Sequence, residues 1–276
     1  MPTYSTQARV NIYDLDAYGE LRPHVMLRLL QQAASDASAA VGFDVEWYEQ
    51  TATLWVIRRT IVDYVAPAFY RDTLEIRTWV SDLRRVRSQR EYEVRRVADR
   101  RLIARASTDW VYVDLARGAP TRPPEEMQRR LLADVGAQSR PPRAAAEPPA
   151  HAARTTRRVE FGDVDSVAHV NNAHYALYVE QAVYDALAAR GWQLNPLERT
   201  ARLRVARHDL EYFAEAQYGD QLDAAIWTTA PDGSAFGSQC TLSRGGTRVL
   251  HAVSRWTWGA PEMPGELHAA VTALSA

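Results

Sequence analysis

Residues 162–175 read Gly-Asp-Val-Asp-Ser-Val-Ala-His-Val-Asn-Asn-Ala-His-Tyr and stand just ahead of a strongly helical segment. They gather two carboxylates, the imidazole of His169 and two amides. A thinned copy occurs earlier, at residues 13–21, Tyr-Asp-Leu-Asp-Ala-Tyr-Gly-Glu-Leu, where Glu20 takes the place of the histidine. The pair of stretches predicts a duplicated chain in which the second copy carries the chemistry.

The repeat extends well beyond these two turns. An offset of 149 residues aligns Asp16 with Asp165 and Ala33 with Ala182, and an offset of 148 aligns Tyr64, Asp72 and Trp79 with Tyr212, Asp220 and Trp227. A slowly changing offset is typical of two homologous modules that differ slightly in their loops. The period is far too long for a solenoid array, so we interpret it as duplication of a small domain.

Composition fits two ordinary cores, because the chain has 276 residues and 46% hydrophobic content. No apolar run approaches the roughly 20 residues of a membrane-spanning helix, and residues 1–5 lack the features of a signal peptide. The one cysteine, Cys240, excludes an internal disulfide and a multi-cysteine metal site, in agreement with a reducing cytosol. A net charge of -1 argues against general nucleic-acid binding. We therefore expect a cytoplasmic protein without membrane insertion.

The first module reads as a strand, a long helix and an antiparallel meander. Residues 7–13 are a strand candidate, and apolar residues at helical spacing predict a helix from Pro23 to about Val41. Alternating stretches predict strands at Leu54–Val65, Thr73–Val80, Arg87–Val97 and Leu102–Val113. The module is expected to cover residues 1–117.

Prolines break the pattern over residues 118–153, which we interpret as an exposed linker, extended in its later part, around one short helix near 125–132. The second module, residues 154–276, repeats the order of the first. Its helix is predicted from near Asn172 to Arg190, and its strands at Ala201–Tyr212, Gln221–Thr229, Gly237–Arg244 and Thr247–Trp258. The chain is thus expected to be an α+β tandem hotdog, in which each curved antiparallel sheet wraps around a long central helix.

Two short motifs carry a family resemblance. Residues 159–165, Val-Glu-Phe-Gly-Asp-Val-Asp, resemble the opening of the 4-hydroxybenzoyl-CoA thioesterase family. Residues 165–172, Asp-Ser-Val-Ala-His-Val-Asn-Asn, resemble the plant and bacterial acyl-ACP thioesterases, and so does the duplicated architecture. The resemblance covers both modules and omits the linker.

The resemblance implies a catalytic set of Asp165, His169 and Glu215, the last following Leu210-Glu211-Tyr212. Two positions depart from the acyl-ACP thioesterase pattern: an asparagine is replaced by Val167, and a cysteine beside the glutamate by Ala216. The implied partner is an acyl carrier protein or coenzyme A thioester, with no cofactor and no metal. Tandem hotdogs act as monomers or pair again, so we expect a monomer or a homodimer.

The residue types suit thioester hydrolysis. The unpaired amides and dipole of a helix start can receive the thioester carbonyl. Asp165 would act as a nucleophile or as the base that activates water, and His169 and Glu215 would orient that water or carry its proton. Asn171 and Asn172 are candidate substrate-binding residues, and the backbone or Asn172 would orient the substrate in place of the asparagine absent at Val167. The expected reaction releases a carboxylic acid and a thiol from acyl-ACP or acyl-CoA.

Other interpretations compete with this one. Asp-x-Asp before a helix is often a capping motif, and Asn171 and Asn172 are ordinary cap residues. A hydratase or dehydratase, or a non-catalytic acyl-thioester-binding protein, would use the same fold. The cluster of arginines at positions 84, 85, 87 and 90 is a candidate phosphate contact, although a solvated surface is the stronger interpretation.

Overall fold

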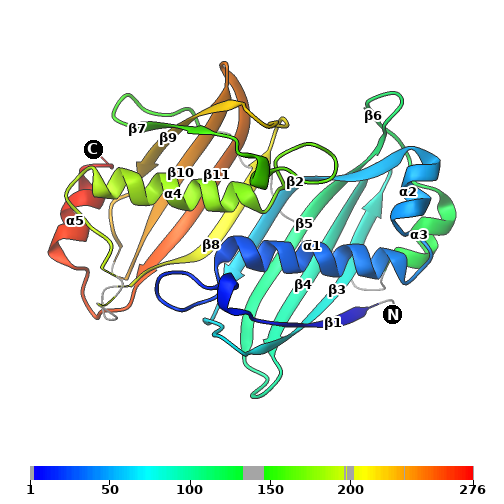
Figure 1. Ribbon diagram of the computed structural model, residues 1–276, viewed down its shortest axis with the longest axis horizontal. Coiled ribbons are helices and arrows are strands. Elements are labelled where there is room, and N and C mark those ends of the chain that lie inside the picture. The colour runs from blue at the N-terminus through cyan, green and yellow to red at the C-terminus, as the bar shows by residue number, and fades with distance from the viewer. Residues whose placement is uncertain (1–2, 133–145, 196, 198–201, 233, 276) are drawn as a thin grey trace. The chain divides into compact units, whose positions relative to one another are not determined.

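The computed structural model describes residues 3–132, 146–195, 197, 202–232 and 234–275 (Figure 1). By its internal contacts the chain divides into two compact units. The first comprises Met1–Leu15 and Glu20–Pro142, and the second comprises Arg143–Ala276 together with Asp16–Gly19. None of the helices in the described ranges is long and apolar enough to cross a membrane.

The first unit is one antiparallel sheet with the helix α1 (Pro23–Ala39) lying across a face of it (Figure 1). Its strands run in the order β1-β3-β4-β5-β2, and the short β6 pairs with β5. Their bounds are β1 Tyr4–Arg9, β2 Thr53–Tyr64, β3 Thr73–Arg84, β4 Arg87–Arg96, β5 Leu102–Asp114 and β6 Ala119–Pro120. Two short helices, α2 (Val45–Thr51) and α3 (Glu125–Leu131), complete the unit.

The second unit repeats this plan around α4 (His174–Ala188), with strand order β8-β11-β10-β9-β7. The bounds are β7 Ala153–Arg158, β8 Leu203–Tyr212, β9 Gln221–Thr228, β10 Ala235–Arg244 and β11 Thr247–Trp258, followed by α5 (Gly265–Thr272). Each unit is a curved sheet around a long helix. The predicted α+β tandem hotdog is therefore confirmed.

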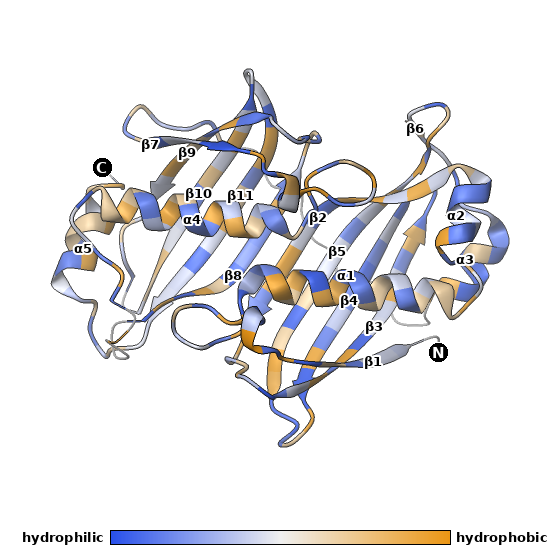
Figure 2. Ribbon diagram, in the orientation of Figure 1, coloured by the Kyte–Doolittle hydropathy of each residue, from blue (hydrophilic) through white to orange (hydrophobic). Residues whose placement is uncertain are grey.

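Period-two patterning explains the sheets, whose strands carry alternating hydrophilic and hydrophobic residues (Figure 2). In β4, for example, every second residue from Ser88 to Val94 is buried. Leu30 and Ala33 of α1, and Val179 and Val183 of α4, are at most 1% exposed. Each core therefore lies between the long helix and one face of its sheet, as helical and period-two patterns together require.

The duplication holds at the level of single hydrogen bonds. Leu15 and Leu21 form an isolated bridge in the first unit, as Val164 and Val170 do in the second. Pairs of equivalent donors and acceptors repeat within each unit: Leu21 N to Ala68 O and Val170 N to Ala216 O, both 2.8 Å, and Arg22 N to Asp14 O and Asn171 N to Asp163 O, both 2.9 Å. The two turns noted in the sequence are thus built on one backbone plan.

The first strand differs from its prediction, since β1 covers Tyr4–Arg9 rather than residues 7–13. The chain leaves the sheet because Ile12–Asp14 form a 3-10 turn, η1, in which the Asp14 carboxylate accepts from the Asn11 amide at 2.7 Å. The helix α2 was not predicted, although Asp44 caps it by accepting from the Trp47 amide at 2.9 Å. Neither was α5.

The short helix expected near residues 125–132 is present as α3. Its Met127 and Leu131 are buried in a cluster with Phe43, Val80, Leu83 and Tyr112, so this helix packs on the first unit. Residues 133–145, which hold the later prolines of the predicted linker, lie outside the described part of the chain.

Candidate active site

The candidate site is built on the turn that links the 3-10 helix η2 (Phe161–Asp163) to α4. Asp163 anchors this turn. Its Oδ2 accepts from the Glu160 amide at 2.8 Å and from the Tyr178 hydroxyl at 2.6 Å, and its side chain lies in the protein interior. Because Tyr178 lies on α4, the turn is fixed against the helix whose start it borders.

Asp165 lies at the centre of the turn and is half-buried. Its amide donates to the His169 carbonyl at 2.9 Å. Its Oδ1 accepts from the Val167 amide at 3.1 Å, and its Oδ2 accepts from Asn171 Nδ2 at 3.3 Å. Both carboxylate oxygens therefore have N–H donors, which hold the orientation of the side chain.

Ala168 closes the turn with φ at 63°, in the left-handed region that glycine adopts most readily. Its amide donates to the Asp165 carbonyl at 3.0 Å. Gly19, the equivalent residue of the first module, has φ at 77°. The backbone geometry is thus the same in both turns, but the second module holds it with a residue for which it is strained.

His169 and Glu215 are brought together from separate segments of the chain. Nε2 of His169 lies 2.9 Å from Oε2 of Glu215. The segment that carries Glu215 is tied to the turn because Val170 N donates to Ala216 O at 2.8 Å. Both side chains reach solvent, with 30% of the histidine and 62% of the glutamate side chain exposed, so water has access to the pair.

A second brace holds the Glu215 segment from its other side. Asp220 Oδ2 accepts from the Gln217 amide at 2.8 Å and from Arg244 Nη1 at 2.7 Å. The Gln217 amide, and then the Arg244 guanidinium, lower the pKa of Asp220 below its usual range. Glu215 is therefore presented by a loop fixed both to the turn and to the sheet.

The helix α4 begins two residues later than predicted, at His174, with Ala173 as its N-cap. Asn171 Oδ1 accepts from the Ala173 amide at 3.0 Å, so Asn171 joins the helix start to Asp165 through one side chain. The Asn172 carbonyl accepts from the Tyr212 hydroxyl at 3.1 Å. The expected capping role of Asn172 is wrong, because the N-cap is Ala173 and Asn172 precedes it.

The first module keeps the turn and changes its chemistry. Asp16 Oδ1 accepts from the Tyr18 amide at 2.8 Å, just as Asp165 accepts from Val167. At the positions equivalent to His169, Glu215 and Asn171, however, the first module has Glu20, Pro67 and Arg22. The hydrogen-bonded turn is thus a property of the fold, whereas the histidine–glutamate pair belongs to the second module.

Sequence reasoning missed the supports of the site. The spacing of Tyr178 from Asp163 gives no recognisable signal. Asp220 did have a signal, because it aligns with Asp72 in the repeat, and Asp72 likewise accepts from the Phe69 amide and from Arg96. Cys240 is fully buried, which raises the pKa of its thiol to about 12 and makes it unsuited to act as a nucleophile.

The fold is that of a tandem hotdog, and both halves of the chain match thioesterase families. Residues 2–131 match the family described as the acyl-ACP thioesterase N-terminal domain, and residues 159–258 match the thioesterase-like superfamily. The N-terminal module thus matches the acyl-ACP thioesterases and the C-terminal module matches the thioesterase-like superfamily.

Its relatives agree with this assignment. The oleoyl-acyl carrier protein thioesterase 1 of Arabidopsis thaliana chloroplasts is 21% identical over 267 residues, which cover 88% of this chain and 68% of the relative. The Coriandrum sativum relative of the same type is also 21% identical, with 62% of its length covered. The chain thus spans about two thirds of the length of these plant proteins.

Two solved structures share the fold over nearly the whole chain. A protein described as an oleoyl thioesterase from Lactobacillus plantarum superposes with a TM-score of 0.81 at 20% identity, covering 94% of this chain and 97% of the other. The 12:0-ACP thioesterase from Umbellularia californica gives a TM-score of 0.77 at 17% identity, with 93% and 94% covered. At these identities the structures support the fold alone.

Proposed function

We propose that this protein hydrolyses an acyl thioester to a carboxylic acid and a thiol, using Asp165, His169 and Glu215. The observation that carries the proposal is the 2.9 Å contact between His169 and Glu215 beside the Asp165 turn, in the second module only. The equivalent turn of the first module keeps the aspartate but not the pair. The duplicated fold therefore does not require these residues, which supports a role in chemistry.

Asp165 supplies the carboxylate that acts on the attacking water. Two N–H donors on its oxygens hold its orientation. The same donors draw charge from both oxygens, which favours activation of water over direct attack on the acyl carbon. In this route the carboxylate takes a proton from water as the water oxygen bonds to the acyl carbon, and the thiolate then leaves.

His169 and Glu215 supply the proton that the leaving sulfur takes up. The glutamate accepts an N–H of the imidazole and so fixes the ring. When both ring nitrogens carry a proton, the one on Nδ1 is given to the sulfur as the C–S bond breaks, and the ring then regains a proton from the Asp165 carboxyl or from solvent. The partial exposure of both side chains allows the proton to be replaced from solvent.

We assign the carbonyl contact to Asn172, next to the start of α4. The amides of Ala173 and His174 are already donated to Asn171, at 3.0 and 2.8 Å. Among the described residues, the side-chain amide of Asn172 makes no hydrogen bond to the helix cap, and its backbone carbonyl accepts from the Tyr212 hydroxyl. An N–H donor fixed there would stabilise negative charge on the carbonyl oxygen in the transition state.

For the substrate we infer an acyl carrier protein thioester, with the CoA thioester as the alternative. The match of residues 2–131 to the acyl-ACP thioesterase domain supports the carrier protein. We also infer a cytoplasmic location, which the single, buried cysteine supports. The monomer or homodimer expected from the sequence remains a prediction.

The deciding experiment measures free-thiol release from paired acyl-ACP and acyl-CoA substrates of varied length, with the wild-type protein and an Asp165→Asn variant. Thiol release by the wild type, lost in the variant, is the expected result. Formation of an enoyl thioester without thiol would instead identify a hydratase or dehydratase. Tight binding of acyl thioesters without turnover would identify a binding protein.

A further inference from the structure

The side chain of Arg90 is buried in the first module, with 7% of the residue exposed. It belongs to β4, where it shares the buried face with Ser88, Tyr92 and Val94. This face of the sheet holds the core and is covered by α1 (Figure 1). The interpretation of Arg90 as part of a solvated arginine cluster is therefore wrong, because the strand alternation turns it inward.

Within the described part of the chain, Arg90 has no carboxylate as an ion-pair partner. Its Nη1 donates to the Thr78 hydroxyl at 3.3 Å. A guanidinium carries five N–H donors and stays charged, so one long contact to a neutral oxygen leaves most of its capacity unused. Burying an ionised group without a counter-ion is costly.

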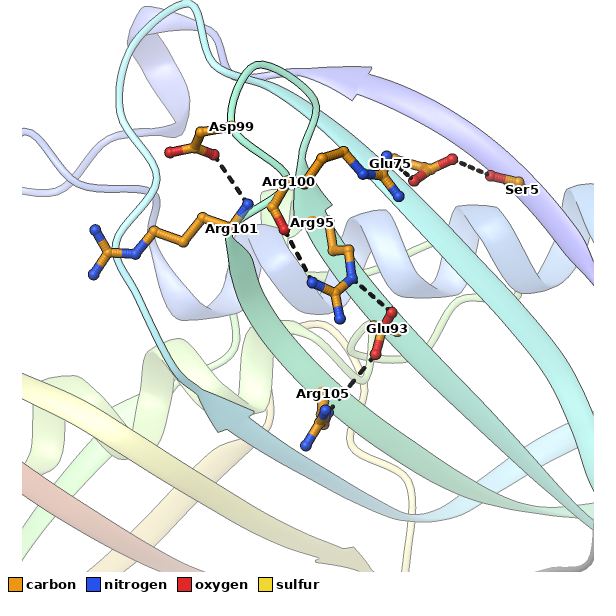
Figure 3. Close-up of polar contacts among 8 residues, drawn as sticks. All are labelled: Ser5, Glu75, Glu93, Arg95, Asp99, Arg100, Arg101 and Arg105. Atoms are coloured by element: carbon orange, nitrogen blue, oxygen red, sulfur yellow. Dashed lines mark hydrogen bonds and ion pairs between the residues drawn. The ribbon is translucent and has the colours of Figure 1, made fainter.

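Three arginines of β4, β5 and the turn between them behave differently (Figure 3). Arg95 pairs with Glu93 at 2.8 Å, and Arg100 pairs with Glu75 at 2.6 Å. Arg105 lies 3.8 Å from Glu93. These three arginines thus have acidic partners, whereas the buried Arg90 has a hydroxyl.

The groups around Arg90 are neutral and partly apolar. Tyr92 and Tyr48 are its titratable neighbours, and Val80 is its partner on β3. The Tyr48 and Tyr92 hydroxyls contact Ser38 at 2.9 Å and Thr108 at 3.2 Å. Burial lowers the pKa of Arg90 from its ordinary value, as expected for a cation without an anion nearby.

The fold does not require a cation at this position. In the second module the equivalent residue is Ser238, which pairs with Ser254 on β11 as Arg90 pairs with Thr108 on β5. Ser238 is 1% exposed and accepts from the Trp256 indole at 2.8 Å, so a neutral, hydrogen-bonded side chain occupies the equivalent position. Arg90 is therefore a feature of the first module alone.

We propose that Arg90 binds the carboxylate of a ligand with an apolar chain inside the first module. A guanidinium matches a carboxylate through two parallel hydrogen bonds, and the Thr78 hydroxyl and the tyrosines are suited to flank it. The carboxylate has two possible sources, both resting on the proposed function: a free carboxylic acid, the product of hydrolysis, or the distal carboxylate of an acyl group that bears one.

The test compares wild type with Arg90→Met, which removes the charge and keeps much of the side-chain volume. Calorimetry measures binding of decanoate and of decanol, which differ only in the carboxylate. Thiol release measures kcat/KM for the decanoyl and 9-carboxynonanoyl thioesters of the carrier that supports turnover. Arg90→Lys keeps the charge but loses the two parallel N–H donors of the guanidinium. It serves as the control and replaces Arg90→Met if that variant does not fold.

A free acid as ligand predicts that Arg90→Met weakens decanoate binding about 10- to 100-fold and leaves decanol binding unchanged. A distal carboxylate predicts a similar loss of kcat/KM for the 9-carboxynonanoyl thioester only. If wild type binds decanol as well as decanoate and neither thioester responds to the substitution, the inference is overturned. If no thioester is hydrolysed by wild type, the proposed function fails, while the binding comparison still decides the role of Arg90.

Discussion

Nε2 of His169 lies 2.9 Å from Oε2 of Glu215, although one residue lies in the turn before α4 and the other in the loop after β8. The Val170–Ala216 backbone hydrogen bond next to the pair holds the two segments together. A contact between an imidazole and a carboxylate in this setting either supports chemistry as a unit or is a surface ion pair of little value.

Replacing each member of the pair by glutamine separates these two cases. If the imidazole acts only when oriented by the carboxylate, His169→Gln and Glu215→Gln each lower kcat, by about 10²- to 10⁴-fold for the histidine. The double variant should then be little worse than His169→Gln alone, since interacting residues are not additive. Steady-state thiol release measures all three. Additive losses, or no loss in either single variant, would contradict the proposed unit.

Asp165→Asn removes the charge of the proposed water-activating group while keeping an Oδ1 that can accept from the Val167 amide. We expect kcat to fall about 10²- to 10⁴-fold, with little change in stability. Asp16→Asn is the matched control, because Asp16 holds the same turn in the first module. It should retain wild-type kcat. Equal losses in both variants would mean that the aspartates act through the turn geometry.

Asn171 and Asn172 have different predicted effects. Asn171→Ala removes the donor to Asp165 and the acceptor for the Ala173 amide, so it should lower both kcat and the free energy of unfolding, the latter by about 1 kcal/mol. Asn172→Ala should lower kcat with little change in stability, because its structural contact is made by the backbone. Thiol release and urea unfolding distinguish them. A stable and fully active Asn172→Ala variant would contradict the proposal that Asn172 contacts the thioester carbonyl.

The fold could be predicted from sequence because its signals are periodic and occur twice. Helical spacing predicted α1 and α4, and strand patterns predicted β2 to β5 and β8 to β11 to within a few residues, whereas β1 was misplaced and β7 was given no range. The turn residues were identified because Asp165 repeats Asp16 while His169 does not repeat Glu20. The burial of Arg90 could not be predicted, because its charge indicated a solvent-exposed side chain. Only the register of the strand decides which face of the sheet the side chain occupies.

Asp220 offers a test by pH. Its pKa is lowered in the folded protein, chiefly by the Gln217 amide, so its contribution to stability is present above the unfolded value of about 3.9 and is lost as pH falls through the lower folded value. Asp220→Asn should therefore destabilise the protein near neutral pH, by at most about 1 kcal/mol, and less below about pH 4. Urea unfolding across this range measures the difference.

The same substitution should lower kcat, because Asp220 braces the loop that presents Glu215. Asp72→Asn is the control, since Asp72 makes the equivalent contacts with the Phe69 amide and Arg96. It should destabilise the protein without lowering kcat. Loss of activity in both variants would show that general loosening, and not the position of Glu215, is responsible.

Ala168 and Gly19 occupy equivalent left-handed positions with different residues, at φ of 63° and 77°. No heavy atom lies within 4 Å of a Cβ added at Gly19, so Gly19→Ala tests the backbone alone and should lower the free energy of unfolding by about 1 to 2 kcal/mol. Ala168→Gly should relieve the same strain, but the gain is reduced by roughly 0.4 to 1 kcal/mol because glycine makes the unfolded chain more disordered. Urea unfolding of the two variants should give effects of opposite sign and unequal size. If the strained backbone at Ala168 also holds Asp165 in position for the reaction, Ala168→Gly will lower kcat while raising the free energy of unfolding. A stabilised variant with unchanged kcat would show that the strained alanine has no part in the reaction.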